Sequence, residues 1–197
     1  MILEGIVTTL DPGGTLNVAP MGPKLGPDPR RFLLRPYKTS TTYRNLKAHG
    51  EGVLHVTDDV LLLARAAIGI LPEPPTRPAS VVRGRILEAT GRHHEFQVVE
   101  LDDRSDRTSI LVESVAQGRQ GDLFGLNRAK HAVVEAAIMA TRLDFLPIAE
   151  VLATYRQLAI LVEKTGGPDE RLAFGLLVDR ALTVVRIRSE ESSDPQS

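Results

Sequence analysis

The stretch that decides the fold reads Arg35-Pro36-Tyr37-Lys38-Thr39-Ser40-Thr41-Thr42-Tyr43-Arg44-Asn45-Leu46 and joins a short predicted strand to a predicted helix. Its first ten residues carry one lysine, two arginines and four Ser or Thr hydroxyls. Backbone amides at a helix start have no partner within the helix and attract anions, and hydroxyls add further donors. The stretch therefore predicts a phosphate site. The alternative is that Thr39 or Ser40 only caps the helix and the other side chains lie in water.

The predicted helix over 39–49 has clear ends. Thr39 or Ser40 supplies the cap, and Gly50 stands where glycine commonly stops helices. The stretch is not a P-loop, because no Gly-x-x-x-x-Gly-Lys occurs. Upstream, the turn signal Asp11-Pro12-Gly13-Gly14 separates two segments of strand character and predicts a hairpin.

Outward from this stretch, strands come first and helices second. This order favours an α+β protein, with a β-barrel or sheet followed by a helical part. We divide the chain into a β domain over 1–118, a helical domain of about three helices over 119–188 and a disordered tail over 189–197. Strands are expected at 2–10, 15–20, 31–35, 52–57, 80–89, 94–101 and 108–115, the last three as a meander; helices are expected at 39–49, 60–70, 126–145, 148–164 and 169–188, and loops at 22–29 and 73–78.

Composition excludes several classes of protein. The chain has 197 residues, no cysteine and a formal net charge of −1. The absence of cysteine excludes disulfides, thiolate metal sites and cysteine nucleophiles, and the near-zero charge removes the usual electrostatic reason to bind nucleic acid. No signal peptide is visible at the start, and the longest apolar stretch, 60–71, is too short to span a bilayer. We expect a cytoplasmic protein with neither membrane nor nucleic acid as a partner.

Several motifs occur in an order that resembles a known superfamily. Asn17-Val18-Ala19-Pro20-Met21 is followed by Lys38-Thr39 at a helix start, by Asn45, and by the strand Gly50-Glu51-Gly52-Val53-Leu54-His55-Val56. This order resembles the split-barrel flavin-binding superfamily, which includes flavin reductases and pyridoxamine-phosphate-oxidase-like proteins. Together with the block Phe124 to Ala137, it resembles the DUF447 family more closely, over residues 1 to about 187. The resemblance implies a split β-barrel that binds flavin mononucleotide (FMN), followed by a helical tail.

The resemblance also assigns roles to individual residues. The isoalloxazine edge would lie along Asn17, Ala19, Pro20 and Met21, and the ribityl phosphate would be held by Arg35, Lys38, Thr39, Ser40, Thr41 and Thr42. Asn45 would close the site or support the helix. Flavin reductases tend to carry an acid between the lysine and the threonine, whereas here Lys38 is followed directly by Thr39. From the residues alone, an equally good interpretation is that Asn17 only forms a hydrogen bond at the end of a strand.

FMN is expected rather than FAD, because no Gly-x-Gly-x-x-Gly fingerprint for a dinucleotide pyrophosphate occurs.

The predicted helix 126–145 carries a second set of polar residues. At 100° per residue, Arg128, His131, Glu135 and Arg142 fall on one stripe opposite an Ala/Val face. Asn127 borders the stripe and Lys130 flanks the apolar face. The stripe is either a surface salt-bridge array or a contact with a partner chain or substrate, to which Asn127, Arg128, Lys130 and His131 would contribute. It is not a His-Glu-x-x-His motif, and no metal site is expected.

The remaining titratable groups are weaker leads. His55 lies inside an apolar strand and is expected in the core, while His93-His94 is expected at a solvated hairpin turn. Asp58-Asp59 and Asp102-Asp103 are expected as turn residues at strand ends.

Two classes of function remain open. One is an FMN-dependent oxidoreductase of unknown substrate, and the other is a flavin-binding carrier, sensor or interaction protein without turnover. An interaction module that has lost the cofactor is a third, weaker reading. A homodimer is expected, because the superfamily is generally dimeric and the late helices carry apolar residues on more than one face.

Overall fold

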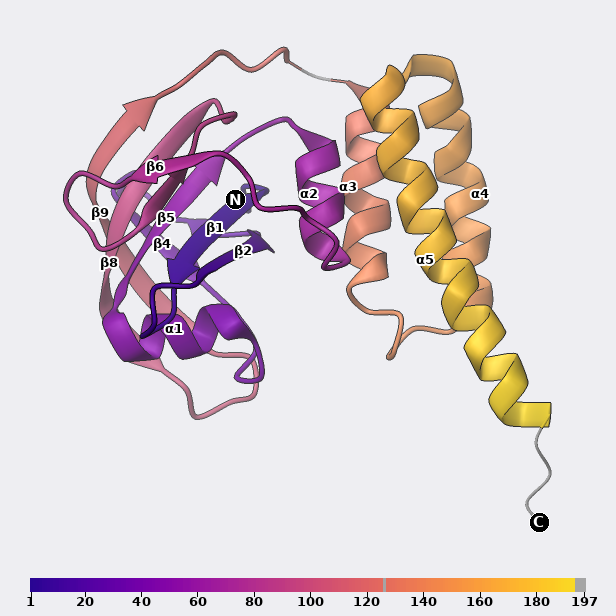
Figure 1. The fold of residues 1–197 in the computed structure, drawn as a ribbon, viewed down its shortest axis with the longest axis horizontal. Coiled ribbons are helices and arrows are strands. Elements are labelled where there is room, and N and C mark those ends of the chain that lie inside the picture. The colour runs from indigo at the N-terminus through magenta and orange to yellow at the C-terminus, as the bar shows by residue number, and fades with distance from the viewer. Residues whose placement is uncertain (126, 194–197) are drawn as a thin grey trace. The chain divides into compact units, whose positions relative to one another are not determined.

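The computed structural model describes residues 1–125 and 127–193, and the contacts between them divide the chain into two units (Figure 1). The first unit joins Met1–Asp58 to Pro72–Phe124, and the second joins Asp59–Leu71 to the chain from Gly125 on. The short helix after the fifth strand therefore groups with the late helices. The sequence-based division at residue 118 stays a prediction.

The first unit is built on a curled antiparallel sheet of seven strands in the order β2-β1-β5-β8-β9-β4-β3. The predicted hairpin is confirmed as β1 and β2. The strands are β1 (Gly5–Leu10), β2 (Leu16–Met21), β3 (Lys24–Leu25), β4 (Arg31–Leu34), β5 (Glu51–Val56), β8 (Arg92–Asp102) and β9 (Ser109–Arg119); a separate pair consists of β6 (Thr76–Pro78) and β7 (Arg85–Leu87).

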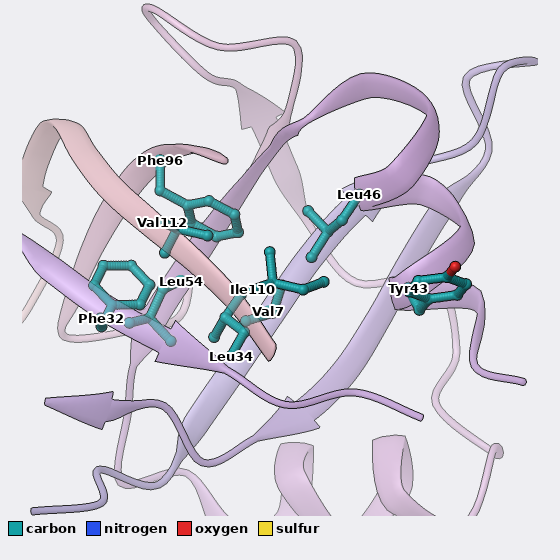
Figure 2. Close-up of a cluster of buried hydrophobic side chains, with 9 residues drawn as sticks. All are labelled: Val7, Phe32, Leu34, Tyr43, Leu46, Leu54, Phe96, Ile110 and Val112. Carbon is teal, nitrogen blue, oxygen red and sulfur yellow. The ribbon is translucent and has the colours of Figure 1, made fainter. Parts of the chain in front are cut away.

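The sheet curls because its longest pair, β8 with β9, is irregular at two points. The register shifts between Glu95 and Phe96 and again between Val98 and Glu100. Such bulges bend the strand and increase its twist. One face of the curled sheet thereby encloses an apolar core, which Figure 2 shows. Its buried members are Val7, Phe32, Leu34, Tyr43, Leu46, Leu54, Phe96, Ile110 and Val112.

Helix α1 (Thr41–His49) supplies Tyr43 and Leu46 to this core. Ser40 is its N-cap, since the Ser40 side chain accepts a hydrogen bond from the Tyr43 amide. Gly50 ends it with φ of 67°, a left-handed conformation that glycine adopts without steric cost. The predicted helix, its cap at Ser40 and its stop at Gly50 are confirmed, although α1 begins at Thr41 and not at Thr39.

The other face of the sheet is covered by the segment that contains β6 and β7. The Glu95 carboxylate, 1% exposed, accepts hydrogen bonds from the amides of Ser80, Val81 and Val82 and from the Ser80 hydroxyl. Burial alone would raise the pKa of Glu95, but these hydrogen bonds together lower it. The carboxylate therefore fastens the 80–82 turn to the sheet as an anion.

The predicted meander of 80–89, 94–101 and 108–115 is wrong in its first member. β7 pairs with β6, which lies in the segment expected to be a connector, and only β8 and β9 pair with each other as expected. The tight turn between Ala79 and Gly84, closed by a 3.0 Å hydrogen bond from the Ala79 amide, folds β7 back on β6. The predicted loop 22–29 likewise contains the short strand β3.

His93 and His94 lie within β8 and not at a solvated turn. His93 is only 4% exposed and His94 is half-buried. Their prediction as turn residues is wrong, because β8 begins at Arg92, immediately after Gly91.

The second unit is an assembly of four helices. α2 packs against α3 and α5, and α3 packs against α4 and α5. A buried face of small residues on α3 lets its neighbours approach closely, and the Tyr155 hydroxyl of α4 donates a 2.7 Å hydrogen bond to the Ala136 carbonyl of α3. The helices are α2 (Val60–Ala67), α3 (Arg128–Ala140), α4 (Ile148–Thr165) and α5 (Pro168–Ser193).

The ends of two predicted segments differ from the structure. Leu126, at the predicted start of the helix 126–145, lies outside the described residues. α5 continues through Ser193, past the predicted start of the tail at Ser189, and residues 194–197 lie outside the described residues. Within the described ranges, no helix is long and apolar enough to cross a membrane.

His55 joins three strands through a neutral imidazole, as expected of a core histidine. It is fully buried, with Nδ1 3.3 Å from the Ile6 carbonyl oxygen and Nε2 accepting a 3.0 Å hydrogen bond from the Leu87 amide. Burial lowers the pKa of His55 to about 3. The folded state therefore resists protonation of this ring.

We expect the stability of the protein to depend on pH through His55. Because the folded pKa lies below the usual 6.5, the unfolded chain binds more protons between pH 3 and 6.5. The stabilising contribution is complete above pH 6.5 and falls by up to about 1.4 kcal/mol per pH unit below it. Urea unfolding between pH 4 and 7.5 measures this slope, which is expected to be shallower in His55→Gln.

The matched control is His131→Gln, which changes an exposed histidine. Its pH slope should equal that of the unmodified protein. Equal slopes in the unmodified protein and in His55→Gln would contradict the assignment.

Candidate functional site

A network of buried polar side chains joins α1 to the edge of the sheet. Asn17 Nδ2 donates hydrogen bonds to the hydroxyl oxygens of Thr9 (3.2 Å) and Thr42 (3.0 Å), and Asn45 Nδ2 donates to that of Thr9 (3.0 Å). Thr9, Thr42 and Asn45 are at most 3% exposed. Thr9 Oγ1 is the hub of the network, and it fixes the first turns of α1 against β1 and β2. We call this region, residues 17–21 and 35–45, the α1–β2 corner.

β2 presents one free edge at this corner. It pairs with β1 on one side and ends the sheet on the other. The register places Asn17 opposite Thr9 and Ala19 opposite Val7, so Asn17, Ala19 and Met21 share the core-facing side. All residues of β2 are only half-buried. The strand therefore offers backbone donors and acceptors along an accessible edge.

The start of α1 keeps donors available. The Ser40 hydroxyl is used twice, since it donates to the Tyr37 carbonyl at 2.7 Å and accepts from the Tyr43 amide. In the described chain, the amides of Thr41 and Thr42 make no hydrogen bond, and neither does the Thr39 hydroxyl. The capping alternative thus holds for Ser40, while the amides of the first turn remain free to meet an anion.

Basic side chains surround these amides. Arg44 donates to the Thr39 carbonyl and to Thr41 Oγ1, both at 3.0 Å, so its guanidinium lies over the first turn. Lys38 and Arg35, which precede the helix in sequence, are half-buried. The guanidinium of Arg107 lies 5.6 Å from the centre of the Tyr37 ring. The positive end of the helix dipole and these cations have the same sign, so both attract an anion to the start of α1.

The β8–β9 turn supplies acidic partners that the sequence did not indicate. Asp103 accepts hydrogen bonds from Lys47 Nζ (2.8 Å) and from the Tyr43 hydroxyl (2.7 Å), which lowers its pKa. Arg104 lowers the pKa of Asp102 to about 2, and the charge of Lys38 contributes a smaller part to both shifts. Asp102 and Asp103 therefore do more than form a turn, because Asp103 holds α1 in place.

The structure brings together only some of the residues that the resemblance assigns. Lys38, Thr39 and Thr41 lie at the start of α1 and are half-buried or exposed, whereas Thr42 and Asn45 are buried in the network. For Ala19, Pro20, Met21 and Arg35, as for the others, contact with a ligand stays a prediction. Sequence reasoning missed Thr9, and it counted Arg44 in the predicted phosphate stretch without giving it a role of its own. Nothing in the pattern of β1 distinguishes Thr9 from Thr8.

The second set of polar residues lies in the other unit. Asn127 caps α3, accepting from the amides of Ala129 (2.8 Å) and Lys130 (3.2 Å), and its Nδ2 donates to the Thr165 carbonyl. Arg128 and His131 are exposed and line a hollow of about 360 Å³ with Asn127 and Leu161. Lys130 Nζ lies 4.0 Å from Glu170 Oε1. The role of these four residues toward a substrate or partner stays a prediction.

Comparison with known proteins adds a family and a fold. Residues 3–120 match the family model described as "Protein of unknown function (DUF447) N-terminal domain", and residues 127–179 match "Protein of unknown function (DUF447)". The structure resembles that of an FMN-bound DUF447 protein from Methanosarcina mazei, with 24% sequence identity and a TM-score of 0.79, over 91% of this chain and 94% of that chain.

Two further similar structures each cover about three fifths of the chain. One is 2-nitrobenzoate 2-nitroreductase from Pseudomonas fluorescens (19% identity, TM-score 0.51, 59% of this chain and 64% of that one). The other is flavoredoxin of Desulfovibrio vulgaris (12% identity, TM-score 0.52, 60% of this chain and 69% of that one). The expected architecture, a split β-barrel followed by helices, is confirmed.

The hub role of Thr9 gives a stability prediction. Thr9→Val keeps the shape of the side chain but removes the oxygen that accepts from the buried Asn45 amide and from the half-buried Asn17 amide, which also donates to Thr42. Leaving buried donors unpaired costs about 1–3 kcal/mol each. We expect urea unfolding to show a loss of at least about 1 kcal/mol, against little change in Thr39→Val, where the hydroxyl is exposed. If the two variants were equally stable, the assignment of Thr9 as the hub of the network would be wrong.

Proposed function

The chain belongs to the DUF447 family, and we propose that it binds FMN at the α1–β2 corner. The observation that carries the proposal is the start of α1, where two unpaired backbone amides lie among hydroxyls and cations, next to the free edge of β2. The FMN-bound state of the Methanosarcina mazei protein supports it.

The donor set fits the phosphate of FMN. A dianionic phosphate requires several donors and a positive field, which the amides of Thr41 and Thr42, the Thr39 hydroxyl and Lys38 supply. Arg44 covers the same turn and adds a second cation. The corner offers one helix start and no glycine-rich turn for a second phosphate, which favours FMN over FAD.

The edge of β2 fits the flavin ring. Because Asn17 Nδ2 is held by two hydroxyls, the amide is fixed and its oxygen faces away from them. The half-buried backbone at Ala19, Pro20 and Met21 continues this edge with further polar groups, and Pro20 lacks an N–H. A flavin ring carries nitrogens and oxygens along its rim, and such an edge can pair with them.

We infer that the bound flavin serves an oxidoreductase whose substrate is not known. FMN supplies the hydride and electron transfer, and this chain supplies binding, orientation and the polarity around the ring. The alternative is a flavin carrier or sensor, which is favoured by one observation: within the described part of the α1–β2 corner there is no histidine, aspartate or glutamate to act as an acid or base.

Anaerobic mixing with reduced nicotinamide separates these two functions. An oxidoreductase should bleach the flavin absorption faster than free FMN is bleached. No acceleration by any of several reductants would favour the carrier.

The proposal gives a binding prediction. Lys38→Ala and Thr41→Ala should each weaken FMN binding by roughly 10- to 150-fold, because a charge-assisted hydrogen bond contributes about 1.5–3 kcal/mol. Riboflavin, which has no phosphate, should lose much less affinity. Titration of flavin into the apoprotein, followed by flavin fluorescence, measures both affinities.

The control is Lys24→Ala, an exposed lysine on β3, which should bind FMN normally. Chromatography of the heat-released flavin tests its identity. FAD as the main species, or unchanged FMN affinity in both corner variants, would refute the assignment.

We further propose a homodimer. α4 and α5 leave large apolar side chains about half exposed, namely Ile160, Leu172, Leu182 and Ile187. Exposed apolar residues in such number favour an additional partner. Light scattering at micromolar concentration should give about twice the chain mass of 21.5 kDa. A monomer that binds FMN tightly would refute the dimer.

A further inference from the structure

A second cationic hollow lies at the other end of the barrel strands. β8 begins with Arg92 and β9 ends with Arg119, and the register pairs these two arginines directly, with His94 opposite Gln117. The hollow measures about 240 Å³ and is lined by Arg92, His93, His94, Gln117, Gly118 and Arg119. Arg92 also pairs with Val56 at the end of β5, whereas α1 precedes the start of β5 at Glu51. The Lys38 amide, just before α1, donates to the Asp106 carbonyl in the β8–β9 turn, so the hollow lies at the opposite end of β8 from the start of α1.

Strand alternation places the four polar side chains on one face. Arg92 and His94 lie two residues apart, as do Gln117 and Arg119, so all four point to the same side of the sheet. The His93 ring occupies the opposite side against Gly118, where an added Cβ would lie 2.3 Å from His93 Cε1. His93 Nδ1 is also 3.0 Å from Gln120 Oε1. The backbone beneath the hollow is thus held in place.

The charges in the hollow are poorly balanced by the chain itself. Arginines directly opposite each other on paired strands repel. Arg119 forms an ion pair with Asp122, but in the described chain Arg92 has no acidic partner. The pKa of His94 is lowered first by burial and then by the charges of His93 and Arg92. An anion between the arginines would remove this repulsion.

His94 is held in a fixed orientation beside the arginines. Its Nδ1 lies 3.4 Å from Ser114 Oγ, whose own hydrogen is directed to the Ala116 carbonyl at 3.3 Å. The Ser114 oxygen therefore accepts from Nδ1–H, and Nε2 of the neutral ring is an acceptor, which makes no hydrogen bond within the described chain. The Phe32 ring meets the His94 ring edge-on at 6.5 Å between centroids and limits its rotation.

We propose that this hollow is a second anion site, which binds the carboxylate or phosphate group of a small molecule between Arg92 and Arg119. Each guanidinium presents a planar fork that matches two oxygens of such a group. Gln117 supplies an uncharged amide donor, and His94 closes one side. The volume of about 240 Å³ is large enough for such an anionic group. The site is separate from the flavin site and does not depend on it.

The test uses protein saturated with FMN, so that a phosphate site at the α1–β2 corner is filled. Inorganic phosphate is titrated calorimetrically at constant ionic strength, with acetate in a second series to distinguish a phosphate from a carboxylate ligand. We expect saturable binding of one or both anions. Arg92→Gln should weaken anion binding about 10- to 100-fold. Arg92→Lys keeps the charge but loses the planar guanidinium, so its affinity should lie between those of Arg92→Gln and the unmodified protein.

Arg77→Gln, which changes an exposed arginine on β6, is the matched control and should bind the anions normally. Arg119→Gln serves as the second variant, and urea unfolding verifies that each variant folds. The proposal is overturned if neither anion binds, or if Arg77→Gln and Arg92→Gln lose affinity equally. FMN affinity is measured in the same variants: its retention in Arg92→Gln supports two separate sites, and a parallel loss would place the flavin phosphate in this hollow.

Discussion

The pairing of β8 with β9 is the interaction on which the rest of the first unit depends. The two strands are the longest in the sheet, and their bulges bend it around the core. Three features of this unit are attached to the pair. Phe96 enters the core, Glu95 holds the covering segment, and Asp103 at the turn holds α1. A change of register here would move all three at once, because one residue of slip exchanges the two faces.

The barrel stabilises itself with buried polar groups where aromatic side chains are scarce. Only 4% of the residues are aromatic, yet His55, Glu95 and the Thr9 network are all buried. Both ring nitrogens of His55, both carboxylate oxygens of Glu95 and the Thr9 hydroxyl oxygen have hydrogen-bond partners, which lowers the cost of burying them. Apolar side chains of similar size can be repacked in several ways, whereas these hydrogen bonds allow one arrangement of β1, β2, β5 and α1.

Local chemistry was enough to predict some elements and not others. The helix 39–49 was predictable because its cap, its apolar face and Gly50 all lie within a few residues of one another. The pairing of β6 with β7 was not, because it depends on a buried carboxylate at position 95 that the alternation of β8 does not reveal. In the candidate site, the free amides followed from the helix start, and the roles of Asn17 to Met21 came from family resemblance. Asp103 reaches Tyr43 and Lys47 across more than fifty residues of sequence, a distance over which spacing carries no information.

The placement of α2 has a consequence for how the chain is made and divided. This helix follows β5 in the sequence, but it packs against α3 and α5, which come at least sixty residues later. During synthesis, α2 leaves the ribosome well before either neighbour exists. Its apolar face therefore stays uncovered while β8 and β9 are still being added. For the same reason no single cut separates the two units. A chain ended at Phe124 would retain α2 without the helices that cover it, and a chain begun at Gly125 would lack one of the four helices that pack together.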